Sequence, residues 1–215
     1  MQRKAMQKLI EWKNSKRRKP LILFGARQVG KSWLLKEFGK QEFNNCVYVP
    51  FDEDPSLHNI FEGGYDIPRI LSMLSAFAEQ EIRPGETLII FDEIQECPKA
   101  LTSLKYFCET ANQYHIAAAG SLLGLIDHQG SGFPVGKVNA LKLFPLSFIE
   151  FLEATGNEIL ASTIESADTK LLNPLANKIE PMLKQYYYVG GMPEAVASFS
   201  EDGSYIRARE IQLEI

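Results

Sequence analysis

The sequence predicts an α/β fold: residues 1–145 are expected to form a five-stranded parallel sheet with helices on both faces, and residues 146–215 an all-α region. Short apolar runs alternate with stretches of helical spacing, and this alternation is typical of β-α-β units. A glycine-rich segment at residues 25–32 joins the first apolar run to the next helix. After Pro145 the short apolar runs stop, while helical spacing continues.

An amphipathic helix is expected first, because residues 1–14 carry apolar side chains on one side with lysines between them. The apolar run at residues 21–24 then predicts a buried strand. Residues 33–38 have helical spacing, and Gly39 is the expected end of that helix. The remaining strands are expected at residues 46–51, 88–91, 116–119 and 138–144, with helices at residues 67–78 and 101–111.

The region after residue 145 predicts helices only. Ser147 and Glu150 are expected to form a capping box where the first of these helices begins. Residues 157–169 give few signals, and the helical pattern that follows them is expected to be interrupted at Pro174 and Pro181. The last segment, residues 205–215, is helical and has no glycine or cap at its end, so we expect the chain to be a piece of a longer protein.

Residues 25–32 read GARQVGKS and fit the phosphate-binding pattern G-x-x-x-x-G-K-[ST]. Gly25 and Gly30 allow the backbone to turn tightly and to bring its N–H groups against a triphosphate. Lys31 can reach the β- and γ-phosphates, and the Ser32 hydroxyl can ligate Mg²⁺. The helix that follows adds an N-terminus, which attracts anions. We expect the nucleotide to contact the loop and the next residue: Gly25, Ala26, Arg27, Gln28, Val29, Gly30, Lys31, Ser32 and Trp33.

Two acidic residues supply the second half of the expected site. Asp92 and Glu93 directly follow the apolar run at residues 88–91, which places both at the carboxyl edge of the sheet, beside the loop. Asp92 is expected to hold Mg²⁺ through water, and Glu93 to polarise the attacking water. We expect the catalytic residues to be Lys31, Glu93 and Ser121.

Other polar residues near this edge have more than one interpretation. Ser121 follows the fourth strand, where it either senses the γ-phosphate or caps a helix at residues 122–126. Lys137 is either a cation that reaches a phosphate, from a neighbouring subunit for example, or, as we favour, a surface lysine. Gln95 is placed to relay the state of either Glu93 or the γ-phosphate. No arginine is identified as the residue that stabilises charge in phosphate transfer.

Charge and composition narrow the class of protein. The net charge of −4 argues against a protein that binds polyanions by charge alone. Residues 16–19 are a basic cluster that either contacts nucleic acid or an acidic partner or, as we favour, is a solvated lead-in to the first strand. The three cysteines and three histidines have no metal-binding spacing, and such sparse cysteines suit a reducing cytoplasm. The N-terminus lacks the apolar core of a signal peptide, and the uncharged stretch at residues 116–126 is too short to span a membrane.

Six motifs in order carry a resemblance to one family. They are GARQVGKS (25–32), LIIFDEIQ (88–95), AGSLLG (119–124), FPVGKV (133–138), PLSFIEFL (145–152) and YVGGMPEAV (188–196). From about residue 6 onward, the chain resembles the bacterial and archaeal AAA-superfamily ATPases that are usually described only as ATP-binding proteins.

The resemblance implies a P-loop NTPase core of the additional-strand type, a three-layer sandwich with strand order 5-1-4-3-2, followed by a helical and winged-helix region. By position, residues 25–32 would bind ATP, Asp92 and Glu93 would be the Mg²⁺ carboxylate and the base, and Ser121 would be the sensor. Many relatives carry arginine where this chain has Lys137. Relatives also continue into a further domain that is often nuclease-like.

These residues are compatible with two main functions. The first is an ATPase, in which Mg²⁺-dependent hydrolysis of ATP to ADP and phosphate drives a conformational switch. The alternative is a nucleotide-binding interaction module that hydrolyses little or no ATP and acts through a partner. A small-molecule kinase is disfavoured because no arginine occurs between residues 120 and 206, and the absence of a guanine-reading motif favours ATP. A second copy of the chain, another protein and nucleic acid are left open as partners, and no membrane is expected.

Overall fold

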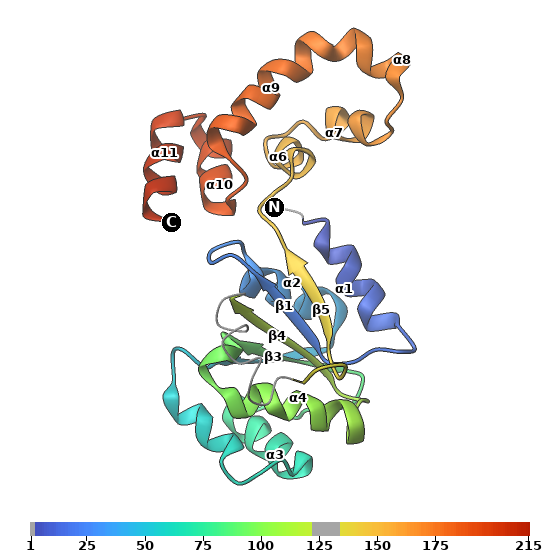
Figure 1. Cartoon of the computed structure of the whole chain (residues 1–215), viewed down its shortest axis with the longest axis vertical. Coiled ribbons are helices and arrows are strands. Elements are labelled where there is room, and N and C mark those ends of the chain that lie inside the picture. The colour runs from blue at the N-terminus through green and yellow to red at the C-terminus, as the bar shows by residue number, and fades with distance from the viewer. Residues whose placement is uncertain (1–2, 122–133) are drawn as a thin grey trace. The chain divides into compact units, whose positions relative to one another are not determined.

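The computed structural model describes residues 3–121 and 134–215 (Figure 1). Its contacts divide the chain into two compact units. The sheet unit contains Met6–Ala26 and Lys31–Leu143. The helical unit contains Met1–Ala5, Arg27–Gly30 and Phe144–Ile215, so the middle of the phosphate-binding loop groups with the helical unit.

The sheet unit is built on five parallel strands in the order β2-β3-β4-β1-β5 (Figure 1). This is the order 5-1-4-3-2 that the family resemblance implies, and that prediction is confirmed. The strands are β1 (Leu21–Gly25), β2 (Asn45–Pro50), β3 (Thr87–Asp92), β4 (His115–Ser121) and β5 (Asn139–Leu143). Because all pairs are parallel, the strand ends that precede the expected site residues meet at one edge of the sheet.

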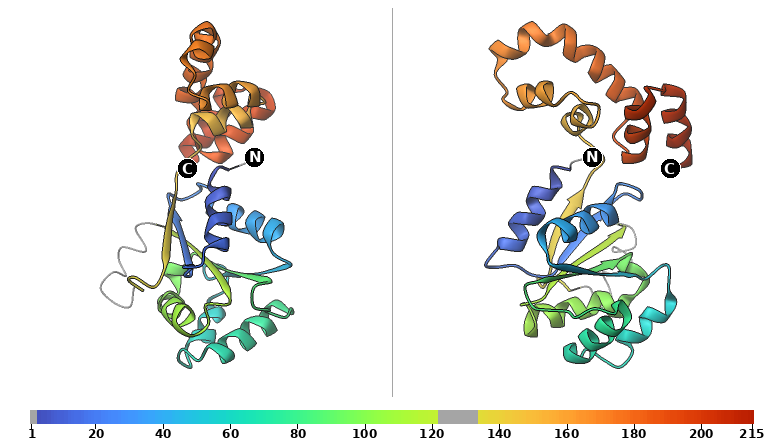
Figure 2. Two further views of the ribbon diagram at one scale, coloured as in Figure 1. Left: turned by 90° about the vertical axis from the view of Figure 1, so that its right-hand side faces the viewer. Right: turned by 180° about the vertical axis from the view of Figure 1, so that it is seen from behind.

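Helices cover both faces of the sheet, as predicted. Alternate side chains of a strand point to opposite faces, and Ile89 and Phe91 of β3 belong to a core cluster shared with α3 (Ile67–Ala78) and α4 (Pro98–Thr110). On the opposite face, α2 (Lys31–Glu42) contacts β1 to β4. Next to α2 lies α1 (Ala5–Asn14) (Figure 2). The rings of Trp12 and Phe38 join these two helices, with centroids 6.1 Å apart. Two 3-10 turns, η1 (Pro55–Phe61) and η2 (Ile94–Glu96), complete the described part of this unit.

The helix after the loop does not end at Gly39, and that prediction is wrong. The helix α2 continues to Glu42. A Cβ on residue 39 would lie 2.9 Å from the Cys46 Sγ and 3.4 Å from a methyl group of Leu88. The glycine is therefore there because α2 packs closely on β2 and β3, and close packing outweighs the low helix propensity of glycine.

The part of the helical unit that the structure describes after residue 144 contains no strand, as predicted. Leu146, Phe151 and Phe199 are buried at its centre. The expected capping box is present, because the Ser147 hydroxyl accepts from the Glu150 N–H and the Glu150 carboxylate accepts from the Ser147 N–H. The elements are α6 (Phe148–Ala154), α7 (Glu158–Glu165), α8 (Thr169–Leu172), η3 (Asn173–Leu175), α9 (Ala176–Val189), α10 (Pro193–Asp202) and α11 (Tyr205–Glu214).

Two local expectations for the helical unit differ from the structure. The expected interruption at Pro174 is present, because η3 separates α8 from α9, but Pro181 lies inside α9 and does not interrupt it. The proline removes one hydrogen bond on an exposed side of the helix, while Tyr186 and Val189 further along α9 pack on the core and hold it. The segment with few sequence signals forms α7, in which Ala161 is the buried residue.

Candidate nucleotide site

The phosphate-binding loop connects the end of β1 to the start of α2. Gln28 and Gly30 both have positive φ angles, 57° and 90°. A Cβ on residue 30 would meet its nearest neighbours only at 3.7 Å, so the left-handed backbone, and not crowding, is what requires a glycine there. Loop backbone of this kind directs successive N–H groups toward one side, where an anion can be bound.

Lys31 is the first residue of α2 and is 5% exposed. Its Nζ donates hydrogen bonds to the Ala26 carbonyl at 2.9 Å and to the Gly25 carbonyl at 3.4 Å. A buried ammonium is costly unless it is hydrogen-bonded, and these carbonyls of the loop meet that requirement. Ser32 follows in the first turn of α2 and is half-buried, whereas Trp33 is exposed. The structure therefore places a buried cation and a hydroxyl at the N-terminus of a helix.

Asp92 ends β3 and is 4% exposed. Each of its oxygens accepts a hydrogen bond from the chain: Oδ2 from the Tyr48 hydroxyl at 2.5 Å, and Oδ1 from the Glu93 N–H at 3.1 Å. A carboxylate oxygen has two acceptor positions, so both oxygens keep one for a further donor. This arrangement fits a carboxylate that contacts Mg²⁺ through coordinated water.

Glu93 has a left-handed backbone, with φ 44° and ψ 50°. Such a conformation is strained for a residue with a side chain, and strain of this kind is often found at functional sites. Its Oε2 accepts a hydrogen bond from Gln95 Nε2 at 2.5 Å. This hydrogen bond is the contact that Gln95 would need in order to relay the state of Glu93, as the sequence predicts.

Tyr48 and Lys36 were not identified from the sequence. Tyr48 lies on β2, opposite Ile90 in the β2–β3 register, and Lys36 Nζ lies 3.5 Å from the centroid of its ring. Burial raises the pKa of Tyr48 above its ordinary value, and so do the hydrogen bond to Asp92 and the charge of that carboxylate. The phenol therefore stays a neutral donor. The signal available in the sequence was a single tyrosine within an otherwise apolar strand.

Ser121 is the last residue of β4 and pairs with Gly25 in the β1–β4 register. It therefore lies at the same edge of the sheet as the beginning of the loop, which suits a sensor of the γ-phosphate. The alternative, a cap for a helix at residues 122–126, concerns residues outside the described ones. A sensor role for Ser121 remains a prediction.

Two further cations, Lys137 and Arg207, bond to acidic side chains of the protein. Lys137 Nζ forms an ion pair with Glu109 Oε1 at 2.9 Å, and that bond raises the pKa of Lys137. Arg207 pairs with Asp202 at 2.7 Å. These contacts are those of surface side chains, which is the interpretation favoured for Lys137. The remaining candidate, Arg27, is exposed.

The basic cluster at residues 16–19 is partly structural. Arg18 Nη1 donates to the Tyr114 carbonyl at 3.0 Å, and Lys19 Nζ donates to the Gly136 carbonyl at 2.6 Å. Lys16 and Arg17 are exposed. Two of the four cations therefore bond to loops of the sheet unit, while exposed Lys16 and Arg17 fit the favoured interpretation of a solvated lead-in to β1.

A second contact network, also missed from the sequence, holds the loop within the helical unit. Arg3 is buried, and its Nη1 donates to the Val29 carbonyl at 3.0 Å. Its Nε donates to Glu150 Oε1 at 3.1 Å, and its Nη2 to the Phe144 carbonyl at 2.6 Å. Burial acts to raise the pKa of Glu150, but amide hydrogen bonds and the charge of Arg3 outweigh it and lower the pKa. One guanidinium thus joins the phosphate-binding loop to Glu150 of the α6 capping box.

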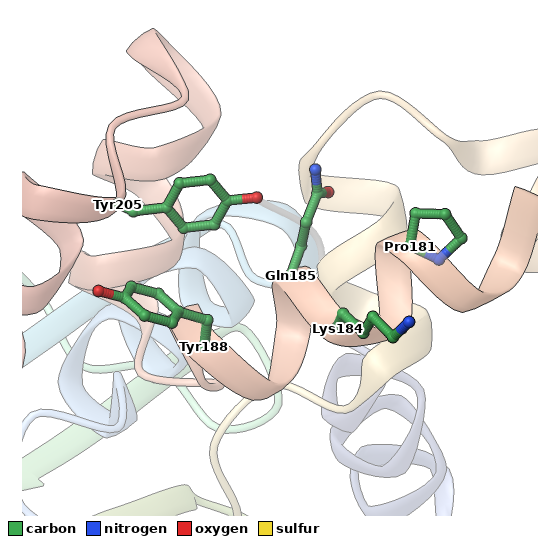
Figure 3. A pocket seen from close by; sticks show the side chains of 5 residues that line it. All are labelled: Pro181, Lys184, Gln185, Tyr188 and Tyr205. Carbon is green, nitrogen blue, oxygen red and sulfur yellow. The ribbon is translucent and has the colours of Figure 1, made fainter.

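The helical unit also has an open hollow of about 530 Å³ (Figure 3). Tyr188 of α9 and Tyr205 of α11 lie edge to face, with centroids 5.1 Å apart. Lys184, a charged residue that lines it, pairs with Glu180 at 2.6 Å.

Among residues 3–121 and 134–215 there is no cluster of three metal-ligating side chains and no helix long and apolar enough to cross a membrane.

Comparisons with known proteins identify the fold and the family. A family model described as an AAA domain matches residues 17–152, well over half of the chain. No match was found among curated proteins. Solved structures are similar at low identity. Drosophila ORC bound to DNA is 16% identical, with a TM-score of 0.50 and coverage of 97% of this chain and 58% of that chain. The Orc1 protein of Aeropyrum pernix in complex with DNA is 16% identical, with a TM-score of 0.46 and coverage of 72% and 48%.

A third solved structure, Cdc6p from Pyrobaculum aerophilum, is 15% identical, with a TM-score of 0.42 and coverage of 71% of this chain and 48% of that chain. The chain therefore spans about half the length of the solved structures that it matches. At these identities the similarity concerns the fold alone.

Proposed function

The chain belongs to the AAA domain family, and on this premise we propose that it binds ATP with Mg²⁺ and hydrolyses it to drive a conformational switch. One observation carries the proposal: buried Lys31 at the start of α2 and buried Asp92 at the end of β3 lie at the same edge of one parallel sheet. The chain itself hydrogen-bonds both charges, and a metal-bound triphosphate is a ligand that complements both of them, with its phosphates toward Lys31 and its metal toward Asp92.

Each residue of the site has a distinct role in this proposal. Lys31 and the N–H groups of residues 25–33 bind the phosphates, and the Ser32 hydroxyl and Asp92 hold Mg²⁺, Asp92 through water. Bound Mg²⁺ offsets the phosphate charge that develops in hydrolysis. Glu93 orients the attacking water and accepts its proton, while Gln95 fixes the Glu93 carboxylate. Ser121 senses the γ-phosphate.

The switch is supported by the contacts of Arg3. A change in loop backbone at Val29 would move the carbonyl that Arg3 binds, and Arg3 also binds Glu150 of α6. Because Glu150 is part of the α6 capping box, a shift of the guanidinium would change how that helix begins. The loop can thus influence the helical unit through two hydrogen bonds.

A second candidate is an interaction module that binds nucleotide but hydrolyses little of it. Arg207 bonds to Asp202 and Arg209 to Gln212, so neither arginine of α11 is identified as the charge-stabilising residue that fast hydrolysis uses. In this case the nucleotide would stabilise one conformation for a partner. A second copy of the chain, another protein or nucleic acid is proposed as that partner, and the Drosophila structure is bound to DNA, so we propose DNA as the first nucleic acid to test.

A cytoplasmic location is proposed from the cysteines. Cys46, Cys97 and Cys108 are all free thiols. Burial raises the pKa of the Cys46 thiol to about 11, so it is an unreactive packing residue. Proteins of oxidising compartments often contain disulfides, whereas free cysteines are typical of the reducing cytoplasm.

Phosphate release by wild type and Glu93→Gln separates the two functions. The ATPase proposal expects turnover in wild type and a loss of roughly 100-fold or more in Glu93→Gln, because general base catalysis contributes about that factor, while ATP affinity is retained. Glu201→Gln, an exposed glutamate on α10, is the matched control and should turn over as wild type does. Nucleotide binding without turnover in either protein would favour the interaction module.

A further inference from the structure

The Asp92 carboxylate is held by two donors from different directions. The Glu93 N–H binds one oxygen at 3.1 Å, and the Tyr48 hydroxyl binds the other at 2.5 Å. The first donor comes from the adjacent peptide and is present whatever residue follows Asp92. The second depends on one side chain from the neighbouring strand, β2. Tyr48 is therefore the group whose removal would free the carboxylate to rotate.

Tyr48 is itself supported from α2. Lys36 Nζ lies 3.5 Å from the centroid of the Tyr48 ring. Lys36 follows Ser32 by four residues, so both lie on the same face of α2, one turn apart. A cation over the face of a phenol holds the ring in place. Residues of α2, β2 and β3 thus form one connected group, from Lys36 through Tyr48 to Asp92.

We propose that Tyr48, supported by Lys36, is a positioning residue that fixes the Asp92 carboxylate in the orientation needed by the water shell of Mg²⁺. The inference rests on the proposed function, because it concerns the metal at the same site. The sequence motifs do not mark either residue, since Tyr48 lies 44 residues before Asp92. Partners of this outer kind orient metal-binding carboxylates and alter metal affinity when they are removed.

The decisive variant is Tyr48→Phe, which removes the hydroxyl and keeps the ring. Affinity for a fluorescent ATP analogue is measured in EDTA and across a Mg²⁺ titration. We expect the affinity in EDTA to stay within about twofold of wild type, because Tyr48 does not belong to the phosphate-binding loop. The Mg²⁺ concentration that gives half of the Mg²⁺-dependent change in affinity should rise about 10-fold. This is the lower end of the range for residues that orient a metal ligand.

Two further variants give the test its specificity. Tyr106→Phe is the matched control, because Tyr106 of α4 stacks on Tyr65 with centroids 4.5 Å apart and does not belong to the proposed group; its Mg²⁺ titration should match wild type. Lys36→Met should raise the Mg²⁺ requirement by about two- to fivefold, the effect of a partly exposed cation on a ring. Because Lys36 is exposed, this variant keeps the test informative even if Tyr48→Phe unfolds.

A double-mutant cycle with Asp92→Asn tests the route of the effect. If Tyr48 acts through the Asp92 carboxylate, adding Tyr48→Phe to Asp92→Asn should change the Mg²⁺ titration by less than about twofold. An unchanged titration in Tyr48→Phe, or an equal loss of affinity with and without Mg²⁺, would overturn the inference and leave the proposed function standing. Absence of nucleotide binding by wild type would instead refute the proposed function.

Discussion

At the residue scale, the chain buries charged groups and supplies their partners itself. Lys31 is held by loop carbonyls and Asp92 by Tyr48 and the Glu93 N–H. Arg3 is held by Glu150 in the same way. Each of these groups would be costly to bury without such partners, so the partners offset the cost of burying the charge.

His115 shows the opposite solution, a titratable group kept neutral. It begins β4, and its ring lies 5.0 Å from the Phe43 ring and 6.0 Å from the Trp12 ring. Burial lowers the pKa of His115 from 6.5 to about 4, and the positive charge of Arg18 adds to the effect. The folded protein therefore binds a proton at His115 less readily than the unfolded chain does.

This shift predicts a loss of stability in mild acid. Between pH 6.5 and about 4 the unfolded chain takes up a proton at His115 that the folded protein does not, so the free energy of unfolding falls as the pH falls. The contribution of His115 is up to about 3 kcal/mol. Urea unfolding at pH 7 and pH 4.5 should show a smaller decrease for His115→Phe than for wild type. An equal decrease in both proteins would refute the assignment.

At the element scale, the strands and the helix at residues 67–78 were predictable because the spacing of their apolar residues indicates which side chains are buried. The loop was predictable because its chemistry fixes four positions in a run of eight. The contact of Tyr48 with Asp92 was not predictable, since it exists only because β2 lies beside β3 in the sheet. The predicted helix end at Gly39 was wrong for a related reason. The glycine allows close packing against Cys46, which belongs to another element.

The Arg3 network was hidden for the same physical reason. The guanidinium joins Val29 and Glu150, which are 121 residues apart, and no local pattern marks the meeting of such distant segments. By contrast, the Ser147 capping box involves residues three positions apart and was predicted correctly. Short-range sequence patterns therefore predicted the elements and the loop. The contacts that support the loop join distant segments, so they could be identified only from the folded structure.

The link between the loop and α6 yields a test at this scale. Arg3→Met leaves the Glu150 carboxylate buried without its charged partner, which should lower the free energy of unfolding by about 3 kcal/mol. Adding Glu150→Leu should recover part of that loss. In hydrogen exchange, ATP with Mg²⁺ should slow the α6 amides in wild type but not in this double variant. Equal slowing in both proteins would show that the loop influences α6 by another route.

At the scale of the whole molecule, the division into units cuts the phosphate-binding loop. Arg27–Gly30 belong to the helical unit, whereas Lys31 and the carboxylate of Asp92 belong to the sheet unit. The boundary near residue 145, expected from the change of sequence pattern after Pro145, remains a proposal.

The most direct test of this account is calorimetry of the chain with ATP and Mg²⁺. Wild type should give saturable heat, and Lys31→Ala should bind about 10- to 100-fold more weakly, the range for losing hydrogen bonds to a charged group. Lys40→Ala, an exposed lysine on the same helix, should bind as wild type does. No heat from the wild-type chain, or equal affinity in the wild type and Lys31→Ala, would contradict the account.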